Sequence, residues 1–118
     1  MKTNLPGLCP VEITVNVAGG KWKPLIIYHL ISGTLRFGEL QRQVSGVSQR
    51  SLTLQLRELE RDGILDRKVF AEVPPRVEYS LTPFGRSLEP VLNVMHSWGQ
   101  DYVARSLLKT NVEDGEVE

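Results

Sequence analysis

The chain has 118 residues and a mass of 13.3 kDa, which is enough for one compact domain and leaves little room for a second core. With 41% hydrophobic and 24% charged residues, its composition excludes collagen-like, mucin-like and wholly disordered chains. The longest strongly apolar run covers residues 25–28, far short of the roughly 20 residues that span a bilayer, and the N-terminus shows no apolar stretch typical of a secretory signal. We therefore expect a cytoplasmic protein with no membrane partner.

The formal net charge is zero, but the charges are unevenly distributed along the chain. Residues 21–86 hold eleven lysines and arginines against seven acidic residues (+4), whereas residues 87–118 hold two against six (−4). The basic middle segment hints at a surface that faces phosphates. The single cysteine, Cys9, cannot form an intramolecular disulfide. Together with His29 and His96 it is too sparse a set for a zinc site, so we expect no metal and no cofactor.

Apolar periodicity and chain-breaking residues define the predicted elements. Pro10 suits the first turn of a helix because its missing N–H would have no partner there, and Gly19-Gly20, Ser45-Gly46 and Asp62-Gly63 each interrupt the chain. Pro74-Pro75 cannot donate ladder hydrogen bonds and therefore belong to a hairpin loop. In chain order, we expect helices over 10–17, 22–32, 37–44 and 49–62, with an extended link over 34–36, then strands over 65–71 and 77–81, one long helix over 83–108 and a frayed acidic tail over 111–118.

The order of these elements is that of a winged helix-turn-helix. Two helices joined by the tight Ser45-Gly46 turn are followed directly by a hairpin, as in that motif. We therefore expect an α+β, mostly helical fold, a winged helix-turn-helix with N- and C-terminal dimerisation helices. Its expected organisation is an N-terminal arm over 1–8, a winged helix-turn-helix domain with dimerisation helices over 9–103, and a helix end with an acidic tail over 104–118.

The predicted helix over 49–62 is the candidate recognition helix. Leu52, Leu56 and Leu59 form its apolar stripe, so polar side chains fall on the side away from the core, where they would face the major groove of DNA. Arginine donates to guanine, glutamine pairs with adenine and a threonine methyl packs on thymine, so this face suits base readout. A polar face is typical of any helix that contacts solvent, so this face alone does not indicate DNA binding. The preceding helix, the Ser48 cap and the following hairpin are what favour DNA binding here. The residues on this face are Gln49, Arg50, Thr53 and Arg57.

Other residues are candidates for contacts with the DNA backbone. Ser48 is a good N-cap, and the N–H groups of a helix N-terminus attract phosphate, although capping alone explains a serine there. Lys68 and Arg76 flank the hairpin loop and could reach the backbone or the minor groove as a wing does. Alternatively, these two cations protect an edge strand from aggregation. Arg67 is a weaker candidate, and Arg36, just before the helix over 37–44, completes the DNA-binding set.

Several sequence runs resemble a known family. They are Cys9-Pro10-Val11-Glu12, Gly20-Lys21-Trp22-Lys23-Pro24-Leu25-Ile26-Ile27, Arg36-Phe37-Gly38-Glu39-Leu40, segment 52–65 and segment 73–83, in which Val73-Pro74-Pro75-Arg76-Val77-Glu78-Tyr79 is the most specific run. Over roughly residues 9–103, the chain resembles the HxlR-type winged helix-turn-helix regulators, a group close to the MarR regulators. The resemblance implies a homodimeric transcription regulator that binds double-stranded DNA at a near-palindromic operator. It identifies neither the effector nor the base preference.

Cys9 is a candidate thiol sensor. It lies directly before Pro10, at or next to the predicted N-cap, where the helix dipole and free N–H groups favour thiolate over thiol. Some HxlR-type regulators sense quinones, aldehydes or oxidants with a cysteine at this position, and the resemblance implies the same use for Cys9. The alternative is a small buried hydrophobic residue, the usual situation of a free cysteine. A sensor thiol here would form a direct adduct, a mixed disulfide with a small thiol, or a disulfide between two subunits.

The long C-terminal helix is the expected dimer interface. Nothing is left in a chain of 118 residues to cover its apolar stripe, so a second copy related by a two-fold axis is the simplest cover. The residues assigned to this interface are Val11, from the predicted helix over 10–17, and Leu88, Val91, Leu92, Met95, Trp98 and Tyr102 from the C-terminal helix.

The sequence shows no catalytic constellation. His29 and His96 lack a nucleophile or carboxylate at a readable spacing, so we expect packed or solvated side chains and no enzyme. The leading hypothesis is a DNA-binding regulator that acts as a homodimer and responds to a small molecule or oxidant. A winged-helix protein-interaction module without DNA affinity is the alternative, which the zero net charge leaves open. A thiol-dependent enzyme ranks third, because a resolving cysteine and a nearby Cys–His pair are both missing.

Overall fold

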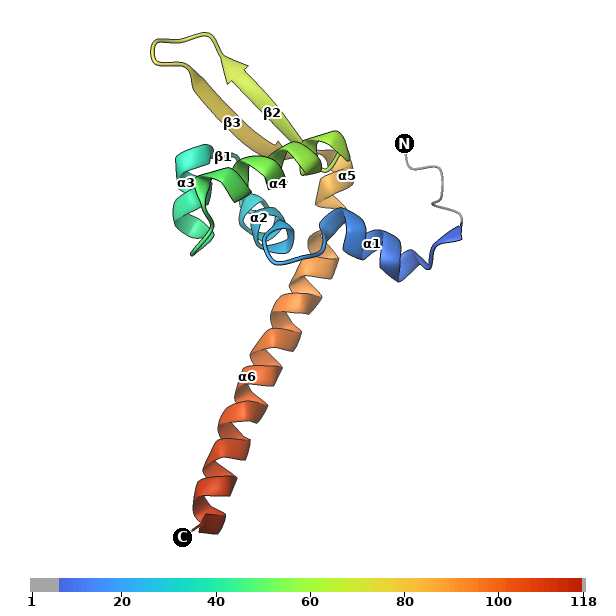
Figure 1. Ribbon diagram of the computed structural model, residues 1–118, viewed down its shortest axis with the longest axis vertical. Coiled ribbons are helices and arrows are strands. Elements are labelled where there is room, and N and C mark those ends of the chain that lie inside the picture. Colours follow the sequence, from blue (N-terminus) through green and yellow to red (C-terminus); the bar gives the residue numbers. More distant parts are fainter. Residues whose placement is uncertain (1–6, 118) are drawn as a thin grey trace.

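The computed structural model describes the backbone of residues 7–117 and the side chains of residues 7–109. A small body carries a projecting hairpin at one end and one long helix at the other (Figure 1). In chain order, the elements are α1 (Pro10–Ala18), α2 (Lys23–Leu30), β1 (Leu35–Arg36), α3 (Phe37–Gln43), α4 (Gln49–Arg61), β2 (Leu65–Phe70), β3 (Arg76–Leu81), α5 (Pro83–Arg86) and α6 (Glu89–Val117). Of the predicted N-terminal arm over 1–8, residues 1–6 lie outside the described part of the chain.

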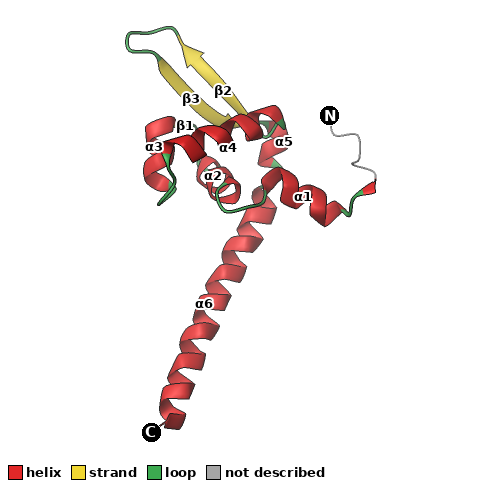
Figure 2. Ribbon diagram, viewed as in Figure 1, coloured by secondary structure: helices red, strands yellow, loops and turns green. Residues whose placement is uncertain are grey.

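The sheet is antiparallel and has the strand order β1-β3-β2. β2 and β3 form the predicted hairpin, with Leu65 opposite Leu81 at its base, and the two prolines lie in the loop. Figure 2 shows this hairpin standing out from the helical body as a wing. The segment predicted as an extended link contains a short strand, because β1 pairs with β3 and places Leu35 opposite Tyr79.

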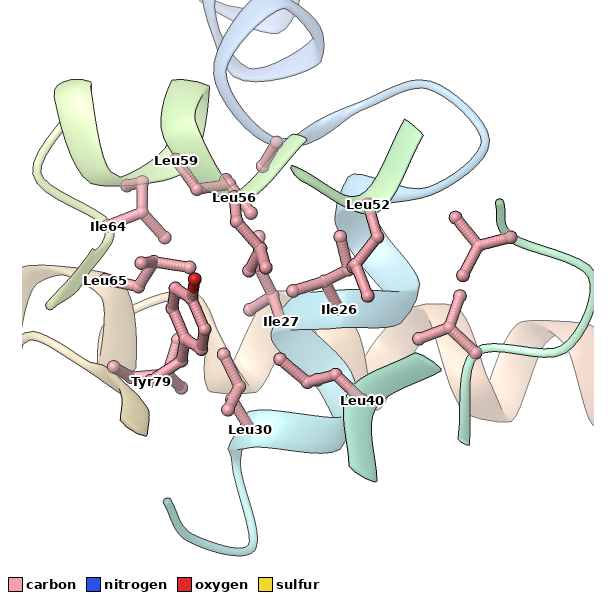
Figure 3. Close-up of a cluster of buried hydrophobic side chains, with 14 of the residues drawn as sticks. Ile26, Ile27, Leu30, Leu40, Leu52, Leu56, Leu59, Ile64, Leu65 and Tyr79 are labelled. Atoms are coloured by element: carbon pink, nitrogen blue, oxygen red, sulfur yellow. The ribbon is translucent and has the colours of Figure 1, made fainter. Parts of the chain in front are cut away.

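One hydrophobic core joins α2, α3, α4 and the base of the hairpin (Figure 3). The predicted leucine stripe of α4 is buried in it, which fixes the rotation of α4 about its own axis and turns the polar side chains of that helix outward. The largest fully buried side chains are Ile26, Ile27, Leu30, Leu40, Val44, Leu52, Leu56, Leu59, Ile64 and Leu65.

Glycines permit two of the tight connections around this core. Gly46 has a φ of 88° in the turn between α3 and α4, a conformation that side chains other than glycine rarely adopt. Gly85, on α5, lies against the start of the hairpin, where a Cβ atom would overlap the carbonyl oxygen of Ile64. α5 therefore packs directly on the backbone that follows α4.

The prediction of one continuous helix over 83–108 is wrong, because the segment is divided into α5 and α6. Pro90 has no N–H to donate to the carbonyl of Arg86, so it fits the first turn of a new helix and not the interior of an old one. α6 also continues to Val117, through the tail that the sequence predicts to be frayed. The other predicted element boundaries agree with the structure to within two residues.

The predicted α+β, mostly helical winged helix-turn-helix fold is confirmed. α3 and α4 form the helix-turn-helix, and the β2–β3 hairpin forms the wing. Among residues 7–117, no helix combines the length and the hydrophobicity that a membrane span needs.

Candidate nucleic-acid interface

α4 begins at the predicted N-cap and exposes its first residues. The backbone N–H of Ser51 donates to Oγ of Ser48 at 3.0 Å, so the serine hydroxyl satisfies one of the free donors of the first turn. Gln49 and Arg50 follow on the surface. The cap thus determines where the helix starts and which side chains stand at its exposed end.

The predicted base-contacting residues do not all have the same exposure. Arg50 and Arg57 are exposed, whereas Thr53 is half-buried. The hydroxyl of Thr53 donates to the carbonyl oxygen of Gln49 at 2.8 Å, which leaves its methyl group and its lone pairs for other contacts. Arg50 and Arg57 are therefore the cations that α4 offers most freely to a ligand.

A groove of about 530 Å³ separates α4 from the hairpin. Arg57 of α4 and Arg67 of β2 both line it, together with Gln49 and Thr53. The sequence gives Arg67 only as a weaker candidate for a wing contact, and its position in this groove has a signal in the sequence. It follows the buried Leu65 by two positions, and alternate residues of a strand share one face of the sheet. The full lining is Phe37, Gln49, Thr53, Leu56, Arg57, Glu60, Arg67, Val77 and Tyr79.

The two predicted wing cations gather around one aromatic ring. Nζ of Lys68 lies 5.0 Å from the ring centroid of Phe70, and Cζ of Arg76 lies 3.9 Å from the same centroid. The guanidinium of Arg76 also lies 3.4 Å from a carboxylate oxygen of Glu72 and 3.3 Å from one of Glu78. Two carboxylates thus balance the charge of Arg76, whereas Lys68 is exposed and has no ion pair within residues 7–109.

Arg36 occupies the start of α3, at the edge of the sheet. Its backbone N–H donates to Oε1 of Glu39 at 2.8 Å, which supports the first turn of α3. Its side chain is exposed. The backbone of Arg36 therefore has a structural role, and its guanidinium stays available to a phosphate.

One member of the basic middle segment is buried and does not face solvent. Nζ of Lys23 lies 2.7 Å from Oε1 of Glu58, and only 10% of the lysine side chain is exposed. The hydrogen bond and the charge of Lys23 lower the pKa of Glu58 below its ordinary value. This pair, which sequence reasoning missed, ties the start of α2 to α4.

Comparison with known proteins decides the family. Residues 17–107 match the family model described as "HxlR-like helix-turn-helix". The chain belongs to this family. It is 57% identical over 97 residues to YdeP of Bacillus subtilis, covering 82% of this chain and 76% of YdeP, and 58% identical over 92 residues to YybR of the same organism, covering 78% and 74%. Both relatives are described as HTH-type transcriptional regulators. This HxlR-like chain is accordingly a transcriptional regulator with a helix-turn-helix DNA-binding domain.

Solved structures with the same fold include a redox regulator and a transcriptional regulator. The oxidised form of the redox regulator HypR has a TM-score of 0.76 and 57% sequence identity, covering 79% of this chain and 96% of that one. Diamide-treated YodB of Bacillus subtilis has a TM-score of 0.67 and 35% identity, covering 80% and 95%. Likeness to MarR-family structures confirms the MarR-like resemblance of this HxlR-like regulator.

Cys9 of this HxlR-like regulator is the N-cap of α1, as predicted, and it is exposed. Its thiol makes no capping hydrogen bond. The alternative of a buried packing residue is therefore wrong for the single chain, and the sulfur is accessible to reagents in solution.

α6 of this HxlR-like regulator leaves most of its apolar residues uncovered. Val91, Met95, Trp98 and Tyr102 are exposed, as is Val11 of α1, and the rings of Trp98 and Tyr102 stack with centroids 5.6 Å apart. The other two predicted interface residues contact the chain's own core: Leu92 is only 5% exposed, and the half-buried Leu88 packs against that core.

The two histidines take part in ring contacts, in line with the prediction of packed or solvated side chains. His96 of α6 is exposed and stacks on Tyr28 with a centroid distance of 5.5 Å, and the half-buried His29 meets the same ring edge-on. Within the described residues, no three His, Cys, Asp or Glu side chains form a group that could hold a metal ion.

Proposed function

We propose that this HxlR-like regulator is a homodimer that binds a near-palindromic operator sequence-specifically, and that oxidants or electrophiles control the binding through Cys9. One observation carries the DNA-binding part. α4 buries its leucine stripe and exposes Arg50 and Arg57 beside a groove whose other wall is the wing.

In this proposal, α4 enters the major groove with its N-terminal half first, as recognition helices do. Arg50 and Arg57 read guanine edges with their paired donors, and Gln49 reads adenine. The exposed Lys68 contacts a phosphate and so adds affinity without base preference. Arg67, on the wall of the groove, gives the wing a second cation close to α4.

The exposed apolar face of α6 supports the homodimer. Trp98 is 67% exposed and Tyr102 is 59% exposed, and α6 projects away from the rest of the chain (Figure 1). A second copy related by a two-fold axis covers the same face on both chains. Such an axis relates two copies of α4 as the half-sites of a near-palindromic operator are related, and binding requires the two helices about one DNA turn or a multiple apart.

Two further observations support control through Cys9. The thiol is exposed at the N-cap of α1, so an oxidant or electrophile in solution can reach it. The structurally similar HypR is described as a redox regulator, and the similar YodB structure is of a diamide-treated protein.

A salt titration of DNA binding with variants tests the base-reading role. We expect DNA selected from a randomised pool to bind with an affinity that falls linearly on a log–log plot against salt. Arg50→Ala should weaken binding to that DNA by about 1–3 kcal/mol and relax the preference at one base pair per half-site. Lys68→Ala should weaken binding to all sequences and reduce the salt slope by roughly one.

Arg61→Ala is the matched control, because Arg61 lies at the other end of α4 and pairs with its neighbour Asp62. It should leave the preference for the selected DNA unchanged. An unchanged ratio of specific to nonspecific affinity in Arg50→Ala would refute the base-reading role of Arg50. No salt-dependent binding at all would favour a protein-interaction module.

A further inference from the structure

The outward face of α4 carries one large apolar side chain. Leu54 is 52% exposed, whereas each leucine of the buried stripe is 2% exposed or less. Leu54 is two residues from both Leu52 and Leu56, which places it about 200° around the helix from each of them, on the side away from the core. All other exposed residues of α4 are polar or charged. Leu54 therefore adds little to the core and is open to a partner of α4.

Leu54 lies beside the two arginines that are proposed to read bases. Arg50 precedes it by four positions and Arg57 follows it by three, and residues at these spacings are neighbours on a helix surface, with Cβ atoms about 5–6 Å apart. A leucine side chain in a helix also leans toward the helix N-terminus. Leu54 therefore covers the space next to Arg50, in the part of α4 that leads into the major groove in the function proposed above.

Thr53 carries the other methyl group near this face, but it lies on a different side of α4. Thr53 is half-buried and lines the groove between α4 and the hairpin, and its hydroxyl donates to the carbonyl oxygen of Gln49. Leu54 comes one residue later, about 100° further around the helix, and lies outside the lining of that groove. Thr53 thus faces the wing, whereas Leu54 faces away from the body.

The proposed homodimer face does not extend to Leu54. The exposed apolar residues assigned to that face lie on α6 and α1, and α6 leaves the body at the end opposite the hairpin (Figure 1). Leu54 lies on α4, which forms one wall of the groove beside the hairpin. A second copy that covers α6 therefore leaves Leu54 uncovered, and in the proposed complex the surface that reaches it is that of the DNA.

An apolar side chain among arginine donors requires an apolar partner on the DNA. The base edges in the major groove present hydrogen-bond donors and acceptors, and the C5 methyl group of thymine is the apolar exception. Pressing Leu54 against a donor or acceptor would remove water from that group without replacing its hydrogen bond, which costs free energy. The base that complements Leu54 is therefore thymine.

We propose that Leu54 is a specificity-determining residue that packs on the C5 methyl group of one thymine in each half-site. This inference rests on the function proposed above and assigns one base of the operator. Adenine, guanine and cytosine present no methyl group in the major groove, so the contact selects for thymine. Since Arg50 and Leu54 are neighbours on α4, the thymine lies within about two base pairs of the base pair that Arg50 reads.

Deoxyuridine tests the contact, because uracil differs from thymine only in lacking the C5 methyl group. The duplex is DNA selected from a randomised pool, and each thymidine of one half-site is replaced in turn by deoxyuridine. At one position, the replacement should weaken binding by the parent chain roughly fourfold, which is the value of burying one methyl group. This position should lie within about two base pairs of the one at which Arg50→Ala relaxes the preference.

Variants of α4 assign the effect to one side chain. Leu54→Ala should bind the thymidine and deoxyuridine duplexes with equal affinity, and its salt slope should match that of the parent chain because no charge is lost. Leu54→Met keeps an apolar side chain of similar size and should keep the discrimination. The matched control Thr53→Ser removes the neighbouring methyl group, keeps the hydroxyl that bonds to Gln49, and should also keep the discrimination.

Three results would overturn the contact. They are equal affinity of the parent chain for every thymidine and deoxyuridine pair, discrimination that survives in Leu54→Ala, and discrimination that is lost in Thr53→Ser. The salt dependence separates this inference from the proposed function. Salt-dependent binding without any effect of deoxyuridine overturns the contact alone, whereas the absence of salt-dependent binding overturns the proposed function and the contact together.

Discussion

The ion pair between Lys23 and Glu58 makes the stability of the body depend on one carboxylate. The two charged atoms are 2.7 Å apart, and the side chains are 10% and 31% exposed. Lysine is almost never buried to this extent without a partner. Glu58→Gln keeps the length of the side chain but leaves the ammonium of Lys23 in the interior beside a neutral amide.

The expected loss of stability follows from the burial of the pair. Removing one partner of a fully buried ion pair costs about 3–5 kcal/mol. Glu58 is about one-third exposed, so water replaces part of the lost interaction, and we expect the free energy of unfolding to fall by about 2 kcal/mol. Glu60→Gln is the matched control on the same helix, where the side chain is exposed, and it should change the value by less than about 0.5 kcal/mol.

Urea denaturation at one fixed protein concentration measures the difference, because the stability of a dimer depends on concentration. The pH dependence gives an independent check. Lys23 lowers the pKa of Glu58, so the folded state holds this carboxylate ionised to a lower pH than the unfolded chain does. The stabilisation is complete above the unfolded pKa of about 4.3 and is lost as the pH falls through the folded value. Between about pH 5 and pH 3, Glu58→Gln should therefore lose less stability than the parent chain.

Two results would show that this reasoning is wrong. One is an equal effect of Glu58→Gln and Glu60→Gln at neutral pH. The other is an acid loss of stability in Glu58→Gln that parallels the loss in the parent chain.

Three further substitutions test other parts of the structure. Gly85→Ala should lower the free energy of unfolding by about 1–3 kcal/mol, because the new Cβ overlaps the carbonyl of Ile64. The control Gly99→Ala, with no atom within 4 Å of the new Cβ, should raise it by roughly 0.5–1 kcal/mol. Urea titration compares the two variants, and equal effects would rule out the close approach of α5 to the backbone of Ile64. Trp98→Glu should sediment as a monomer, whereas the control Asn93→Glu, also exposed on α6, should sediment as a dimer. A dimeric Trp98→Glu would show that the interface does not include this face of α6. Cys9→Ser should bind DNA with normal affinity under reducing conditions, since the thiol makes no capping hydrogen bond. Diamide should no longer change its DNA affinity. A DNA affinity that still changes with diamide would exclude Cys9 as the sensor.

The sequence predicts best those elements in which the local signals agree. For α4, the N-cap serine, the leucine spacing and the closing glycine all indicate the same helix, and the structure confirms the ends to within one residue. Pro90 carried a local signal for the break between α5 and α6, but the long apolar periodicity outweighed it. The pairing of Lys23 with Glu58 has no local signal, because it depends on how α2 packs against α4. The same holds for the engagement of Arg76 by two glutamates, which exists only once the hairpin is in place.

In the homodimer proposed above, the base of α6 would act as the pivot of a long lever. α6 has 29 residues, which at 1.5 Å per residue span about 43 Å, and its contacts with the body lie near its start, where Leu92 joins the core and His96 stacks on Tyr28. A rotation of about 5° at this pivot displaces the far end of the lever by about 4 Å relative to the body, close to the roughly 3.4 Å rise of one base pair. In that homodimer, two such levers joined by their α6 faces would convert an angular change too small to disturb either core into a change in which base pair each α4 meets.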